Sequence, residues 1–198
     1  MKTSNSLVRL IIRLLVVAVL LSVAVFVADR LPYPTDVEAP FYASGTVGAT
    51  VTTPTVALQV HGAKVADKLQ LYSSTLVANG HWLVVEGTIT ARRGPGYGYA
   101  DLVIGGRTYT PDNRSPTGTF PVSMLPLAAG IPQKGVWVFE LPDEALKAPD
   151  ARFNAWVGEL SELPRFFPRI PSITIALDEQ HTPRVSTIAP AKSVIVAP

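Results

Sequence analysis

The chain has 198 residues, of which 47% are hydrophobic and 16% are charged, and its formal net charge is +2. This length allows one domain with an appendage. Three of the 17 basic residues, Lys2, Arg9 and Arg13, precede an apolar run, so the remainder is nearly neutral and lacks the basic surface of a DNA- or RNA-binding domain. The absence of cysteine excludes a disulfide framework, a thiolate zinc site and an acylated lipobox cysteine.

The first predicted element is Leu10–Ala28, in which Arg13 lies near the start and an uninterrupted apolar run follows from Leu14. As a helix, Leu10–Ala28 would be about 28 Å long, which matches the roughly 30 Å hydrocarbon core of a bilayer. We favour a retained transmembrane signal-anchor over a cleaved signal peptide. Cleavage after Ala24 would leave a bulky apolar start, and cleavage after Ala28 would put Phe26 where a small residue is needed.

The charges beside the apolar run predict its orientation. Three basic residues precede it and only Arg30 closely follows it, which places residues 1–9 in the cytoplasm and the remaining chain outside. Residues 29–44 then form a linker that includes the stiff tether Leu31–Pro40. Secretion after cleavage is the alternative localisation.

Residues 45–179 show short runs with apolar residues at every second position, separated by turn-forming residues. This alternation predicts half-buried antiparallel strands, and Gly105-Gly106 predicts a two-residue hairpin. Short strands without long helices between them favour an all-β sandwich. The predicted apolar faces are Val47, Ala49 and Val51; Val56, Leu58 and Val60; Leu83, Val85 and Ile89; Trp137, Phe139 and Leu141; and Ile173, Ile175 and Leu177.

Two segments have weaker signals. Pro142–Asp150 predicts a short helical turn with acidic residues early and Lys147 late. Residues 180–198 form a C-terminal tail, in which Lys192–Ala197 is either a last edge strand or part of a disordered end.

Three stretches resemble a known family: "NGHWLVVEGTITAR", "ADLVIGGRTYTPD" and "LPLAAGIPQKGVWVFELPDEA". Across Gly80–Val157 they are similar to extracytoplasmic bacterial domains of unknown function with a telokin-like fold. The resemblance implies an immunoglobulin-like antiparallel β-sandwich and carries over no catalytic residue. The Ala-, Val-, Arg- and Pro-heavy composition resembles that of a high-GC actinobacterium.

The sequence offers little catalytic chemistry. His61, His81 and His181 lack further ligands at metal-binding spacing, and we interpret them as surface imidazoles. Neither G-x-S-x-G nor S-x-x-K occurs, and Gly94, Gly96 and Gly98 do not match a phosphate-binding loop. We therefore expect no enzymatic activity, no cofactor and no metal.

Two segments rich in aromatic and basic residues are candidate partner-binding sites. The first is the loop containing Arg92, Arg93, Tyr97 and Tyr99, for which a flexible connection is the alternative. The second contains Arg165, Phe166, Phe167 and Arg169, where the favoured alternative is that both phenylalanines plug the end of the sandwich.

These expectations combine into one functional hypothesis. The chain would be a membrane-anchored extracytoplasmic interaction module, an accessory subunit of a cell-envelope complex that binds an envelope protein through these segments or an open strand edge. The alternative is a secreted or anchored sandwich that binds a small ligand or lipid between its sheets.

Overall fold

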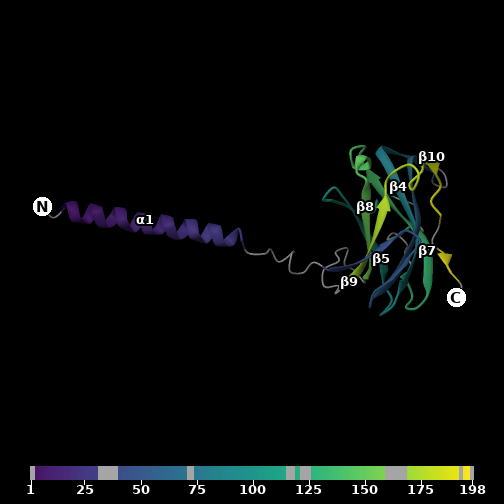
Figure 1. The fold of residues 1–198 in the computed structure, drawn as a ribbon, viewed down its shortest axis with the longest axis horizontal. Helices are drawn as coiled ribbons and strands as arrows, with labels where there is room; N and C mark the ends of the chain where they lie inside the picture. The colour runs from purple at the N-terminus through teal and green to yellow at the C-terminus, as the bar shows by residue number, and fades with distance from the viewer. Residues whose placement is uncertain are drawn as a thin grey trace. The chain divides into compact units, whose positions relative to one another are not determined.

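The computed structural model describes residues 3–30, 40–70, 74–114, 119–120, 126–158, 169–191 and 194–196. It divides into two compact units, Met1–Ala39 and Pro40–Pro198 (Figure 1). Residues 31–39 of the predicted tether lie outside the described residues.

The first unit contains the helix α1 (Thr3–Ala28), which begins earlier than the predicted span. Within the part of the chain that the structure describes, no helix is long and apolar enough to cross a membrane. The predicted transmembrane span Leu10–Ala28 is therefore unsupported. Its first two side chains, Leu10 and Ile11, lie outside the described ones.

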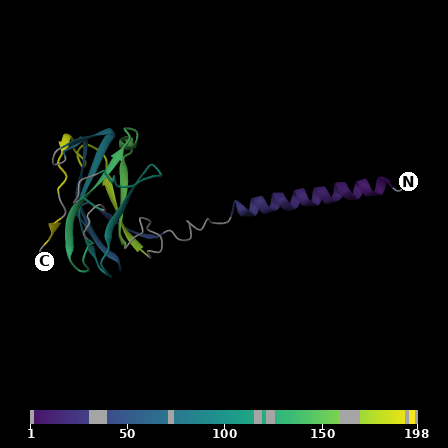
Figure 2. The same cartoon turned by 180° about the vertical axis from the view of Figure 1, so that it is seen from behind.

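The second unit is a sandwich of two β-sheets, seen from opposite sides in Figures 1 and 2. Sheet A has the strand order β1-β9-β8-β5-β6, and sheet B has the order β10-β3-β4-β7-β11 with β2 beside β3. The strands of sheet A are β1 (Phe41–Thr46), β9 (Arg169–Ala176), β8 (Asp150–Gly158), β5 (Tyr97–Ile104) and β6 (Arg107–Tyr109). Those of sheet B are β10 (Arg184–Ile188), β3 (Val56–Gln70), β4 (Thr75–Ala91), β7 (Pro132–Leu141), β11 (Val194–Ile195) and β2 (Thr50–Thr52).

Strand direction follows the prediction in the interior of both sheets and departs from it at two edges. The pairs β3–β4, β4–β7, β5–β8 and β8–β9 are antiparallel. In contrast, β1 runs parallel to β9 and β10 runs parallel to β3. Both edge strands reach their partners from distant parts of the chain, as parallel pairing requires.

The core between the sheets confirms four of the five predicted apolar faces. The sets beginning at Val56, Leu83, Trp137 and Ile173 are all buried. The first set is wrong for two of its three members, because Val47 and Ala49 are exposed in the turn that joins β1 to β2, whereas the half-buried Val51 packs against the core. Gly48 makes that turn with a φ of 88°, a conformation that other residues adopt only at a cost.

The predicted turns are confirmed. Gly105 and Gly106 have φ values of 56° and 78°, and they join β5 to β6 as the two central residues of a hairpin. The short helical turn is the 3₁₀ helix η1 (Ala145–Lys147). Lys147 Nζ lies 2.7 Å from the Glu144 carboxylate, which places opposite charges at its two ends.

Candidate functional site

The candidate site is the outer face of sheet A, where β5 places two predicted residues. Tyr97, Tyr99 and Asp101 are half-buried and alternate along β5 with the buried residues Gly98 and Ala100. Because side chains alternate between the faces of a strand, the half-buried set points away from the core. Both tyrosines therefore lie on a strand rather than in the predicted loop.

The aromatic rings on this face contact one another. The ring centroids of Tyr97 and Tyr99 are 6.5 Å apart, with planes at 63°. Tyr99 also stacks on Trp156 of β8, with centroids 6.1 Å apart and planes at 22°. Trp156 is only 1% exposed, so Tyr99 rests on a fixed support and presents a preordered aromatic surface.

A polar pair lies beside the rings. Asn154 of β8 donates a hydrogen bond from Nδ2 to Asp101 Oδ1 at 2.6 Å. Burial raises the pKa of the Asp101 carboxyl, while the Asn154 bond and the charge of Arg152 oppose that shift. Burial, and then the charge of Asp101, also raise the pKa of Tyr42 on β1. The hydroxyl of Tyr42 therefore lies close enough to Asp101 and Arg152 to be influenced by their charges.

Two buried atoms of this face have no hydrogen-bond partner in the described part of the chain. They are the acceptor Asn154 Oδ1 and the donor Trp156 Nε1. A buried polar atom without a partner costs about 1–3 kcal/mol. Both atoms are enclosed beneath the surface, so they are not available to a molecule that binds on this face.

The predicted arginines lie in different surroundings. Arg92 donates a hydrogen bond from Nη1 to the Thr53 carbonyl at 2.7 Å, which ties it to the turn before β3. Arg93 is exposed in the loop before β5, and Arg169 is exposed at the start of β9, in register with Phe41. The remaining predicted residues, Arg165, Phe166 and Phe167, lie outside the described residues.

The three histidines each contact a polar side chain, which sequence spacing alone did not show. His61 Nε2 is 2.8 Å from Thr88 Oγ1, and His181 Nδ1 is 2.8 Å from Asp178. His81 lies between two carboxylates, 2.9 Å from Asp67 and 3.3 Å from Asp143. Within the described ranges, no cluster of three or more His, Cys, Asp or Glu side chains is arranged to hold a metal ion.

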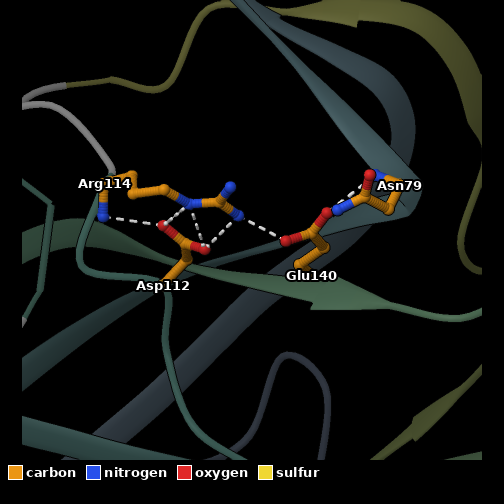
Figure 3. Close-up of polar contacts among 4 residues, drawn as sticks. All are labelled: Asn79, Asp112, Arg114 and Glu140. Atoms are coloured by element: carbon orange, nitrogen blue, oxygen red, sulfur yellow. Dashed lines mark hydrogen bonds and ion pairs between the residues drawn. The ribbon is translucent and has the colours of Figure 1, made fainter.

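A charged network on sheet B has a structural role. Arg114 binds the carboxylates of Asp112 and Glu140, and Glu140 accepts the Asn79 backbone N–H at 2.7 Å (Figure 3). The hydrogen bond to Asp112, followed by the one to Glu140, raises the pKa of the guanidinium. The guanidinium carbon lies 5.4 Å from the ring centroid of Trp82. Because two carboxylates already neutralise Arg114, it covers Trp82 rather than offering a free cation.

The fold of the chain is similar to those of solved structures of other proteins. No protein-family model and no curated protein matches the chain, so no family model supports the family resemblance seen in the sequence. The chain is similar to the yjhA protein of Bacillus subtilis, with 12% identity over 65% of this chain and 98% of that one and a TM-score of 0.44. It is also similar to an uncharacterized β-sandwich protein of Clostridium difficile 630, with 10% identity over 73% and 99% and a TM-score of 0.42. A candidate lipoprotein of Staphylococcus aureus has 7% identity over 73% and 97% and a TM-score of 0.41.

The buried carboxyl predicts how stability changes with pH. The pKa of Asp101 is raised in the folded protein, so the protonated carboxyl stabilises the fold. This contribution is fully present below the unfolded pKa of about 3.9, and it is lost as the pH rises through the folded pKa. Asp101→Asn keeps an acceptor for Asn154 and carries no charge. We expect this variant to be more stable than the wild type at pH 7, with a difference that shrinks below about pH 4. Urea unfolding of both proteins across this range measures it, and a difference independent of pH would contradict the assignment.

Proposed function

We propose that the chain is a non-enzymatic binding module of a bacterial cell envelope, and that the outer face of sheet A contacts its protein partner. The observation that carries this proposal is the pair of half-buried rings of Tyr97 and Tyr99, which contact each other while Tyr99 stacks on the buried Trp156. Aromatic side chains held in place before binding contribute a large contact area at a low entropic cost. The immunoglobulin-like resemblance agrees with such a role by analogy alone.

The surface extends across the sheet to its edge. Tyr42 on β1 is 45% exposed, and Phe41 beside it is 77% exposed. Since β1 is an edge strand of sheet A, a partner that covers the tyrosines of β5 and extends across the sheet reaches Tyr42 and the backbone of β1, whereas Phe41, the preceding residue on the strand, points to the opposite face. Strand addition at such an edge is a common mode of peptide binding.

The proposal includes a membrane location. Large apolar side chains of α1 are exposed along its length, with Leu20 63% and Phe26 60% exposed. Leaving such a surface in water is unfavourable, and we propose that a bilayer covers it, with the domain on the extracytoplasmic side. Tethering at the membrane would raise the effective concentration of the module near an envelope partner.

Site-specific photo-cross-linking in native membranes tests the binding surface. A photoreactive phenylalanine analogue replaces Tyr97, and the matched control carries it at Lys68, an exposed position on β3 of the other sheet. We expect a cross-linked envelope protein from position 97 only, and its loss when Tyr99→Ala is added. The proposal is wrong if both positions label the same proteins or if Tyr99→Ala changes nothing.

Carbonate washing of the same membranes tests the location. The full chain should stay in the membrane pellet, whereas a chain without residues 1–30 should be released. A full-length chain in the soluble fraction would contradict the anchor. A mature chain starting near Val25 or Asp29 would instead establish secretion.

A further inference from the structure

A second surface lies on the other side of the sandwich, under residues 184–191 and 194–196 near the C-terminus. At one edge of sheet B, β10 pairs with β3, and at the other edge β11 pairs with β7. Residues 189–191 lie between these strands and face side chains of β3, β4 and β7. Figures 1 and 2 show the yellow C-terminal segment on the side of sheet B that faces away from sheet A.

Two adjoining hollows form a groove beneath this segment. Each has a volume of about 360 Å³, and they share Glu86, Val136 and Ala191. Volumes of this size are typical of sites for small organic molecules. The groove therefore has room for a ligand that lies along sheet B.

The two ends of the groove differ in polarity. At the first end, the polar side chains of His61, Lys64 and His181 line the wall together with Val84. The second end is lined by the Glu86–Lys134 ion pair and, apart from that pair, by Gly135, Val136, Ala191 and Val194. A molecule that fits both ends has a charged or polar head and an apolar body.

The charges favour a negative head. The Glu86 carboxylate is 2.6 Å from Lys134 Nζ. This hydrogen bond, and after it the charges of Lys134, His61 and Lys64, lower the pKa of Glu86. One carboxylate thus faces three basic side chains, and no residue that the structure describes forms an ion pair with Lys64.

We propose that this groove binds an anionic amphiphile with one short apolar chain, of the class of medium-chain carboxylates. Its carboxylate lies at Lys64 and His61, and its chain lies along Val136 and Ala191. Lys64 is exposed and available, in contrast to Arg114, whose charge two carboxylates neutralise.

This proposal is independent of the proposed function. The groove is on sheet B, whereas the surface with Tyr97 and Tyr99 is on sheet A. Loss of the cross-link at position 97 would leave the groove untouched, and absence of ligand binding would leave the protein interface untouched. A negative result in one experiment would therefore leave the other proposal unaffected.

Calorimetric titration of the full-length chain with octanoate tests the groove, with the same membrane mimetic in every sample and in the blank. We expect saturable binding of octanoate. Hexanoate should bind on the order of tenfold more weakly, because it buries two fewer methylene groups. Octanol, which keeps the chain without the charge, should bind more weakly than octanoate.

Four variants locate the binding. Lys64→Gln should weaken octanoate binding roughly threefold to fivefold, whereas Lys68→Gln, an exposed lysine on the same strand outside the groove, should not. Ala191→Trp should abolish binding by filling both hollows, whereas Ala128→Trp in an exposed loop should not. Unchanged urea unfolding curves would establish that these exposed substitutions leave the fold intact. The proposal is overturned if octanoate shows no saturable binding, if both lysine variants behave alike, or if Ala191→Trp binds as well as the wild type.

Discussion

Trp137→Ala should lower the free energy of unfolding by about 3–5 kcal/mol, the largest single effect we expect in the domain. Trp137 on β7 is completely buried. Its ring centroid lies 4.7 Å from that of Phe120 and 5.0 Å from that of Phe153. Alanine would leave a cavity among these rings that neither sheet can close. Urea unfolding followed by circular dichroism measures the loss.

A comparison of two tryptophans separates packing from hydrogen bonding. Trp137 Nε1 donates to the Gly98 carbonyl at 3.2 Å, which links sheet B to sheet A. Trp156 is equally buried, but its Nε1 has no partner in the described part of the protein. Trp137→Phe should therefore cost about 1–3 kcal/mol more than Trp156→Phe, because it leaves the Gly98 carbonyl without a donor. Equal costs would contradict this assignment.

Two glycines explain why a tryptophan fits at this position. Gly87 of β4 and Gly135 of β7 are paired in register. A Cβ on Gly87 would lie 2.8 Å from the Gln59 carbonyl and 3.2 Å from Trp137 Cζ3, and one on Gly135 would lie 2.5 Å from Phe120. The space that Trp137 and Phe120 occupy thus exists because both paired residues lack a side chain.

The sequence was sufficient for features that depend on neighbouring residues. Alternation alone identified the buried faces beginning at Val56 and Trp137, and Gly105-Gly106 identified a hairpin, because both signals are complete within one segment. It was not sufficient for the parallel edges. The five residues Arg184–Ile188 show no alternation, since their apolar residues are Val185 and Ile188, and nothing within them encodes which strand they join or in which direction.

The candidate site was predictable only in part for the same reason. Tyr97, Tyr99 and Asp101 recur at every second position, a strand signal that the surrounding glycines led us to interpret as a loop. Trp156 and Asn154 join them through the register of β5 with β8, which pairs Tyr99 with Trp156. The groove on sheet B needs the C-terminal segment to pass over Val84 and Val136, and no local pattern predicts such a crossing.

Removing residues 184–198 should destabilise the domain by about 2 kcal/mol or more and increase binding of the dye ANS. Ile188 packs against a second apolar cluster on the outer face of sheet B, consisting of Ala66, Leu69, Trp82, Val84, Val136 and Val138. Truncation uncovers part of that cluster and removes β10 from the edge of β3. Ending the chain at Pro183 keeps the hydrogen bond from Val65 N–H to the Pro183 carbonyl, so the loss reports on the deleted segment.

A shorter truncation serves as the control. Removing only residues 194–198 deletes β11, whose Val194 and Ile195 are 55% and 68% exposed and bury little apolar surface. We expect this variant to unfold within about 0.5 kcal/mol of the wild type, because Ile188 still covers the apolar cluster. If both truncations cost the same, the stabilisation comes from the pairing of β11 with β7 rather than from Ile188. In that case the segment would be fixed at its far end, and deleting β11 alone would open the groove along its whole length.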